Sequence, residues 1–152
     1  MNERRIAFVV GHSHWGKSKT LCALTNGNSH LRRVIIAGVE FFIRRMSNDD
    51  QREGFIEFMM SLDPTFLPNV IAALCPKFDD SATNTILTTL RAKGYQLFFW
   101  VIKHQYGGAK VVEEDEIDRL RGLGTVEEFS ESAEADSRSK LFMRFVTDVV
   151  LA

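Results

Sequence analysis

Residues 9–18 read Val9-Val10-Gly11-His12-Ser13-His14-Trp15-Gly16-Lys17-Ser18. Residues 4–10, which lead into this stretch, form a short β-prone run without polar alternation, and such a run predicts a buried strand. Residues 17–25, which follow it, lack strong helix breakers and end at Asn26-Gly27-Asn28, which predicts a short helix. The stretch therefore predicts a strand, a loop bounded by two glycines and a helix in direct succession.

This loop has the residue types that hold a phosphate group. Gly11 and Gly16 permit backbone conformations that a Cβ would block, so that successive N–H groups can curl around an anion. The N-terminus of the following helix adds a positive dipole. Lys17 would reach the β- and γ-phosphates, and the Ser18 hydroxyl would bind Mg²⁺. The alternative is a glycine turn that only joins a strand to a helix and leaves Lys17 solvated.

The pattern G-x-x-x-x-G-K-S from Gly11 to Ser18 resembles the Walker A motif of the P-loop NTPases. The resemblance implies a three-layer α/β fold and the binding of ATP or GTP as cofactor with Mg²⁺. The residues that it implies for nucleotide binding are Gly11, His12, Ser13, His14, Trp15, Gly16, Lys17, Ser18 and Lys19. The motif itself covers only Gly11 to Ser18, and the alternation of strands and helices extends the resemblance weakly over residues 1 to about 105.

The middle of the loop is bulky for a phosphate site. The backbone of His12, Ser13, His14 and Trp15, rather than their side chains, would therefore hold phosphate. We expect Trp15 to pack on the fold or lie on the surface rather than stack on a base. A metal site formed by the two histidines is disfavoured, because no third ligand is near in sequence.

The rest of the chain predicts the scaffold. Further strands are predicted over residues 31–37, 39–46, 69–75 and 95–104, and helices over residues 50–62 and 82–93. The first two of these strands form either a hairpin at Gly38 or one strand with a bulge there. Alternating strands and helices predict one α/β domain, residues 1–152, with a mainly parallel sheet of about four to five strands flanked by helices.

The last third of the chain has a different composition. Residues 108–137 contain an acidic helix face at 113–118, a flexible point flanked by Gly122 and Gly124, and a second acidic stretch. We expect a lid or flexible segment there. Residues 139–152 predict an amphipathic C-terminal helix. Its apolar side would pack on the core or, less commonly, serve a homo-oligomer.

P-loop enzymes need an acidic residue near the metal. The predicted strands 69–75 and 95–104 end without one, so the best candidates are Asp49 and Asp50, which follow the strand 39–46. The position is similar to that of an acid in the small shikimate and gluconate kinase group, where it contacts the metal and the phosphate acceptor. We assign the metal to Ser18 and Asp49. The alternative is that Asp49 or Asp50 caps the helix 50–62.

Arginines can neutralise charge that develops on a transferring phosphoryl group. Arg119 and Arg121 lie in the expected lid, and Arg44, Arg45 and Arg52 flank the turn at 47–50. The predicted catalytic set is Lys17, Asp49 and Arg121. The alternative for each arginine is a solvated or salt-bridged surface position. For Arg119 and Arg121, the neighbouring Glu116 and Asp118 favour local pairing.

Two functions fit these residues. One is Mg²⁺-dependent binding of a purine nucleotide with phosphoryl transfer or hydrolysis, by a kinase-like protein or a hydrolase that acts on a phosphoryl acceptor or on water. The two sequence signatures of GTPases, D-x-x-G and N-K-x-D, do not follow the expected strands, and ATP is therefore favoured over GTP. The other is a nucleotide-binding regulatory protein with a protein partner and little or no hydrolysis.

Bulk composition narrows the possible partners and the expected cellular location. The net charge is −1 and the isoelectric point is about 6.4, which argues against nucleic acid or an anionic membrane as a partner. The apolar runs are too short to span a bilayer. Cys22 and Cys75 lie in apolar stretches without CxxC spacing or neighbouring histidines, which indicates two reduced, buried thiols. We therefore expect a cytoplasmic protein.

Overall fold

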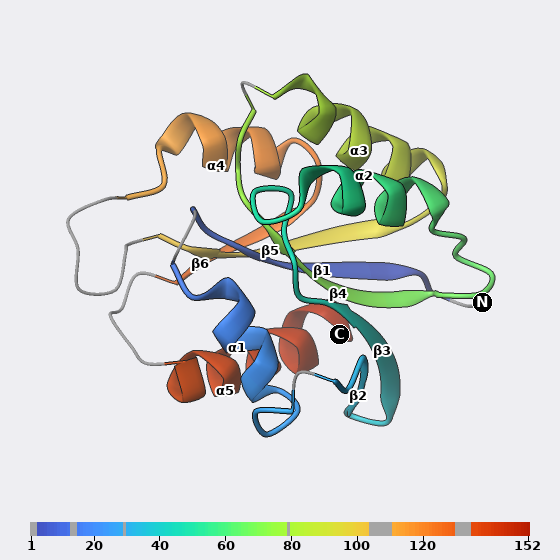
Figure 1. Ribbon diagram of the computed structural model, residues 1–152, viewed down its shortest axis with the longest axis vertical. Helices are drawn as coiled ribbons and strands as arrows, with labels where there is room; N and C mark the ends of the chain where they lie inside the picture. The colour runs from blue at the N-terminus through green and yellow to red at the C-terminus, as the bar shows by residue number, and fades with distance from the viewer. Residues whose placement is uncertain (1–2, 13–14, 29, 79, 104–110, 130–134) are drawn as a thin grey trace.

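The computed structural model describes residues 3–12, 15–28, 30–78, 80–103, 111–129 and 135–152. Its six strands form one sheet in the order β2-β3-β4-β1-β5-β6 (Figure 1). The strands are β1 (Arg5–Val10), β2 (Arg33–Ile36), β3 (Val39–Arg44), β4 (Asn69–Leu74), β5 (Gln96–Ile102) and β6 (Thr125–Phe129). The helices are α1 (Lys17–Ala23), α2 (Arg52–Ser61), α3 (Ser81–Ala92), α4 (Glu114–Arg121) and α5 (Ala135–Phe145), and a π-helical turn, η1 (Val146–Val150), continues α5.

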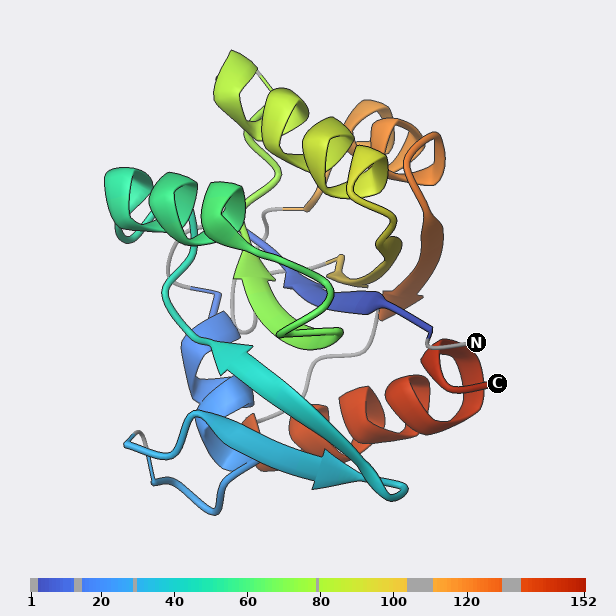
Figure 2. The same cartoon turned by 90° about the vertical axis from the view of Figure 1, so that its right-hand side faces the viewer.

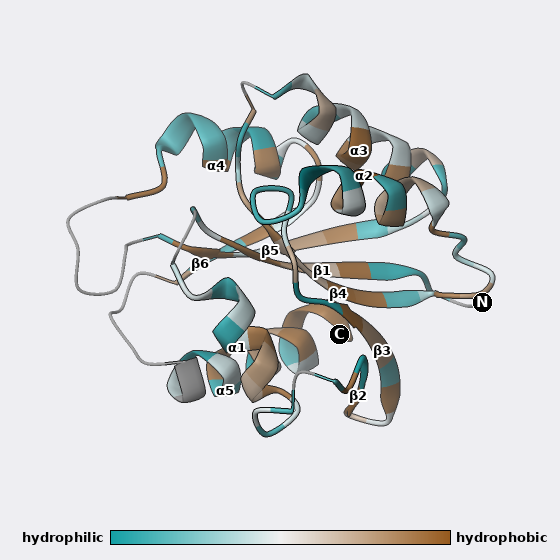
Figure 3. Ribbon diagram, in the orientation of Figure 1, coloured by the Kyte–Doolittle hydropathy of each residue, from teal (hydrophilic) through white to brown (hydrophobic). Residues whose placement is uncertain are grey.

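The helices cover both faces of the sheet. α1 and α5 lie on one face, and α2, α3 and α4 lie on the other (Figures 1 and 2). The central strand β1 pairs in parallel with β4 on one side and β5 on the other, and all five of its residues after Arg5 are fully buried. A strand buried on both faces reads as a continuous apolar run, which is why no alternation is visible at residues 6–10. The apolar colour of the central strands in Figure 3 shows the same layer.

Aromatic side chains join the layers of the core. Phe8 on β1 stacks on Phe99 of β5 with ring centroids 5.3 Å apart. Trp100 on β5 contacts Phe129 of β6 at 4.9 Å and Phe142 of α5 at 5.6 Å. The contact between Trp100 and Phe142 holds α5 on β5, which is the neighbour of β1, the strand that leads into the glycine-bounded loop.

The structure confirms the α/β class and the mainly parallel sheet, and it decides one open alternative. Residues 33–44 form an antiparallel hairpin, β2–β3, which turns through Ala37 and Gly38. Both turn residues have positive φ, 50° and 80°, and a two-residue turn of this hand matches the twist of the two strands.

The strand count was underestimated. The sheet has six strands, and the additional one, β6, pairs in parallel with β5 inside the stretch 108–137 that was expected to be a lid or flexible segment. Its sequence contains Glu127 and Glu128, and only Phe129 is buried. An edge strand with a single buried residue shows almost no alternation of apolar and polar residues. The acidic composition of the stretch therefore did not predict a strand. Residues 104–110 and 130–134 lie outside the described residues.

Within the described ranges, none of the helices is long and apolar enough to cross a membrane.

Candidate functional site

The loop of residues 11–16 leaves the carboxyl end of β1 between its two parallel neighbours. The Gly11 N–H donates to the Leu74 carbonyl at 3.1 Å, which ties the start of the loop to the end of β4. α1 then covers one face of the sheet, whereas α3 and α4 cover the other (Figure 1). Strand ends that send their helices to opposite faces open a crevice where α/β proteins bind ligands. Ser13 and His14 lie outside the described residues.

Gly16 closes the loop in a left-handed conformation with φ 84°. A side chain is strained in this region, and glycine is not. The next residue, Lys17, is the first of α1 and is only 5% exposed. Its Nζ donates to the His12 carbonyl at 2.8 Å, so the amine folds back across the loop.

Burial determines the electrostatics of this amine. Burial lowers the pKa of Lys17, and the nearby carboxylates of Asp50 and Asp49 act in the opposite direction. A buried ammonium without a full counter-charge is costly, and a bound anion would lower that cost. Lys17 is therefore placed and charged to favour a negative ligand.

A cavity of about 400 Å³ opens beside this amine. It is lined by Trp15, Gly16, Lys17, Ser18, Lys19, Asp50 and Arg138. Three of these residues are cationic and one is a carboxylate, so the lining favours an anion and offers hard oxygen ligands from Ser18 and Asp50. Five of the lining residues, Trp15 to Lys19, come from the loop and its helix, and Gly11 and His12 are not among the lining residues.

Arg138 is the lining residue that sequence reasoning missed. It lies on α5, is 5% exposed, and donates from Nη1 to the Trp15 carbonyl at 2.8 Å. The predicted C-terminal helix began one residue later, and nothing in the local sequence distinguishes Arg138 from a solvated arginine. Only the packing of α5 against α1 brings it to the loop.

The turn at 47–50 holds the two candidate acids. Asp50 accepts from the Ser47 N–H and hydroxyl, each at 3.1 Å, and lines the cavity. Asp49 instead forms an ion pair with Lys77, which follows β4. Both carboxylates lie near enough to Lys17 to oppose part of the lowering of its pKa by burial. The structure thus brings both acids to the loop and places Asp50, not Asp49, in the cavity wall.

A buried amide fixes this turn against β4. Asn48 donates to the Cys75 carbonyl at 2.9 Å and accepts from the Cys75 N–H at 2.7 Å. The capping alternative for the acids is not realised, because α2 begins at Arg52 with Gln51 as its N-cap. The turn is therefore held by its own contacts to the strand end rather than by the helix.

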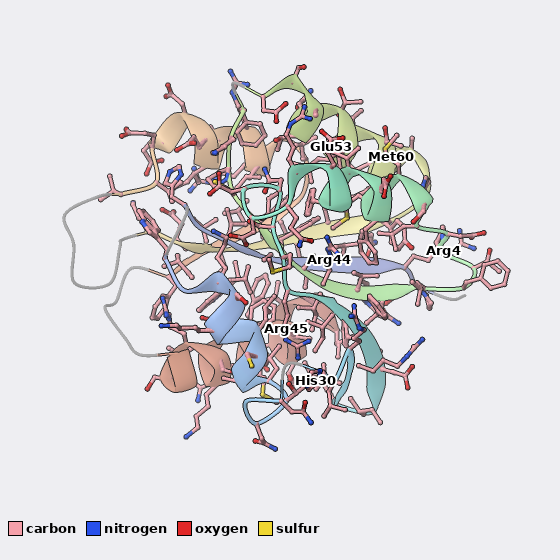
Figure 4. The ribbon with its side chains drawn as sticks, viewed as in Figure 1. Arg4, His30, Arg44, Arg45, Glu53 and Met60 are labelled. Carbon is pink, nitrogen blue, oxygen red and sulfur yellow. The ribbon has the colours of Figure 1, made fainter. Side chains whose placement is uncertain are left out.

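The candidate arginines lie in other contacts. Arg121 donates to Asp118 at 2.8 Å and to Glu128 at 2.9 Å, and it does not line the cavity. Arg119 lies over the Phe78 ring at 5.4 Å. Arg44 lies over the Phe58 ring at 5.4 Å, and Arg45 donates to Thr25 at 2.8 Å; Figure 4 labels both arginines. Arg52 donates to Asp80 at 2.8 Å.

His12 and Trp15 have side-chain contacts of their own. His12 Nε2 is 3.3 Å from Glu116 Oε1, and its Nδ1 is 3.9 Å from Cys75 Sγ. Trp15 is 2% exposed and meets the His12 ring edge-on at 5.1 Å, so its indole packs on the fold. In the described part of the chain no three His, Cys, Asp or Glu side chains are grouped to hold a metal ion. Mg²⁺ needs fewer protein ligands, since it binds through one or two side-chain oxygens together with phosphate and water.

No protein-family model matches the chain, and no curated protein matches its sequence. Two solved structures share its fold. A de novo designed protein of the PLOOP2X3_50 fold, solved by NMR in solution, aligns with a TM-score of 0.57 and 10% identity over 97% of this chain and 95% of that chain. The crystal structure of APE1195 aligns with a TM-score of 0.53 and 11% identity over 99% and 98%. At these identities the likeness shows the fold alone.

Proposed function

We propose that this protein binds a purine nucleoside triphosphate, ATP in preference to GTP, with Mg²⁺ in the cavity beside Gly16, Lys17 and Ser18, and that it transfers or hydrolyses the terminal phosphoryl group. The observation that carries the proposal is the buried Lys17 amine, held on the His12 carbonyl at the wall of a cavity lined by three cations. An ammonium has three N–H donors and His12 takes one, so others can reach phosphate oxygens.

The lining residues would have different roles in such a site. Lys17 would hold the β- and γ-phosphates, and Lys19 and Arg138 would add positive charge at the wall. Ser18 and Asp50 would hold Mg²⁺, which when bound would neutralise charge on the phosphates. Because Asp49 is paired with Lys77, we now favour Asp50 over Asp49 for the metal.

The test of binding uses Lys17→Ala, with Lys140→Ala, an exposed lysine on α5, as the matched control. At a hundredfold excess over Kd, Mg·ATP should stabilise the wild type by about 2.7 kcal/mol. At about 2–4 °C per kcal/mol this is a shift in Tm of about 5–10 °C. Lys17→Ala removes a charge-assisted contact worth about 1.5–3 kcal/mol and should weaken binding by about 10- to 100-fold. A wild type with no shift, or a Lys17→Ala protein that binds normally, would overturn the proposal.

A regulatory protein with little hydrolysis is the second candidate. It is favoured by the end of β4, where the described chain continues as Cys75, Pro76 and Lys77 without a carboxylate. Steady-state turnover of Mg·ATP distinguishes the two functions. Nucleotide binding without turnover supports the regulatory protein, and turnover that rises only with an added acceptor supports a kinase.

Asp50→Asn and Asp49→Asn then identify the acid. If Asp50 holds the metal, Asp50→Asn should lower Mg²⁺-dependent turnover by tenfold or more, on the order of 1.4 kcal/mol. Asp49→Asn should change it less, because Asp49 lies outside the cavity lining. The reverse order would return the metal to Asp49.

A further inference from the structure

Arg138 joins the last helix of the chain to the loop, 123 residues away from its partner Trp15 in sequence. We propose that Arg138 is a positioning residue for the bound phosphates. It holds the Trp15–Gly16 peptide in one orientation and adds a permanent charge to the cavity wall. This inference rests on the proposed nucleotide function and names a residue that the sequence resemblance does not supply.

The contact to the loop is direct and buried. Nη1 of Arg138 donates to the Trp15 carbonyl oxygen at 2.8 Å, and the side chain is 5% exposed. The same side chain lines the cavity beside Lys17.

Because a peptide group is planar, the contact to the Trp15 carbonyl also fixes the direction of the Gly16 N–H. The described peptide bonds are all trans. In a planar trans peptide the C=O and the following N–H point in opposite directions. A guanidinium fixed on the Trp15 carbonyl therefore directs the Gly16 N–H away from Arg138. The loop is held in this form before any ligand arrives, which lowers the entropy cost of binding.

Gly16 accepts the guanidinium because it has no side chain. A Cβ at Gly16 would lie 2.5 Å from Arg138 Nη2, and φ there is 84°. The second glycine of the motif is thus needed both for its backbone conformation and for the approach of Arg138.

The position of the guanidinium is set by the core. Phe142, one turn further along α5, contacts Trp100 of β5. α5 also packs along α1, the helix that begins with Lys17 (Figure 1). A guanidinium on a helix anchored in this way is pre-organised, and it stays charged at any pH at which the protein is folded.

The test separates the charge from the hydrogen bond. Arg138→Gln removes the charge and keeps an N–H donor, whereas Arg138→Lys keeps the charge and loses the planar fork. Arg144→Gln is the matched control, because Arg144 is exposed on the same helix. Calorimetry gives the Kd of Mg·ATP for each protein at several salt concentrations, and urea unfolding gives the stability of each.

Arg138→Gln should weaken Mg·ATP binding by about tenfold or more and reduce the salt dependence of Kd, because a charge-assisted contact is lost. Arg138→Lys should recover the salt dependence but only part of the affinity. Arg144→Gln should match the wild type. A purely structural role would lower stability in urea and leave both the Kd of the folded protein and its salt dependence unchanged, and this result would overturn the inference.

The two proposals fail differently. If Lys17→Ala abolishes binding while both Arg138 variants bind like the wild type, the nucleotide site stands and the role of Arg138 is refuted. If the wild type binds no nucleotide, the proposed function fails and this inference fails with it. Should Arg138→Gln not fold, Arg138→Lys decides, since wild-type affinity in that protein would refute the positioning role.

Discussion

At the scale of single residues, burial gives two groups near the loop unusual chemistry. Lys17 carries an ammonium in a site that is 5% exposed, and burial lowers its pKa. Cys75, at the end of β4, is fully buried, and burial raises the pKa of its thiol to about 11. The two shifts have one cause, because a low dielectric disfavours the charged form of acid and base alike.

Cys75 should therefore resist alkylation while the protein is folded. With a pKa of about 11, roughly one thiol in a thousand is ionised at pH 8, and the thiolate is the nucleophile. Cys22 is only half-buried, so the expectation of two buried thiols is wrong for this residue, and Cys22 should react first. Mass spectrometry after iodoacetamide at pH 8 should show one adduct, at Cys22, in the native protein and two in urea. Equal labelling of both cysteines in the native state would contradict the burial of Cys75.

At the scale of elements, the site is assembled from three parts of the chain, which are a loop, a turn and a helix. The loop after β1 supplies the backbone and Lys17, the turn after β3 supplies Asp50, and α5 supplies Arg138. Asn48 links the turn to β4 through both backbone groups of Cys75. The edge strand β6 depends on a different close contact, between Gly124 and the start of β5.

Gly124→Ala should separate β6 from the sheet. A Cβ at Gly124 would lie 2.2 Å from the Leu97 carbonyl oxygen, and this backbone atom cannot move away cheaply. We expect a loss of about 2–3 kcal/mol in the free energy of unfolding, as for other overpacked sites. Gly122→Ala is the control, because the nearest atom, the Arg119 carbonyl oxygen, would lie at an acceptable 3.4 Å. Chemical denaturation checks both, and equal stability of the two variants would argue against the close approach.

At the scale of the whole molecule, stability is concentrated in the middle of the sheet. β1 is buried on both faces and is paired on both edges, whereas β2 is an edge strand with exposed residues. The loop that carries Lys17 therefore starts from the most protected strand of the sheet. The β2–β3 hairpin, at the edge of the sheet, is the least protected part.

Hydrogen exchange should follow this gradient. Amides of β1, β4 and β5 should exchange only through global unfolding, and those of β2 should exchange through local opening with much smaller protection. Mass spectrometry of peptides from these strands measures both. If β2 were as protected as β1, a further partner would have to cover its free edge in solution.

Local patterns in the chain were enough for the loop, the central strands and the fold class. The loop residues that matter lie within one short stretch, from Gly11 to Ser18. Their joint placement therefore depends only on one strand and the helix after it. The apolar runs of β1, β4 and β5 are equally local, because burial on both faces leaves a continuous signature. The bounds of these elements differ from prediction by one or two residues.

The tertiary structure alone decided the rest. The choice of Asp50 over Asp49 depends on an ion pair with Lys77, which lies on another connection. The place of Arg138 depends on how α5 packs on the sheet and along α1, and β6 depends on pairing with β5 despite its acidic sequence. Such contacts join residues far apart in the chain, and their free energy comes from burial and charge in the assembled core, so no local pattern records them.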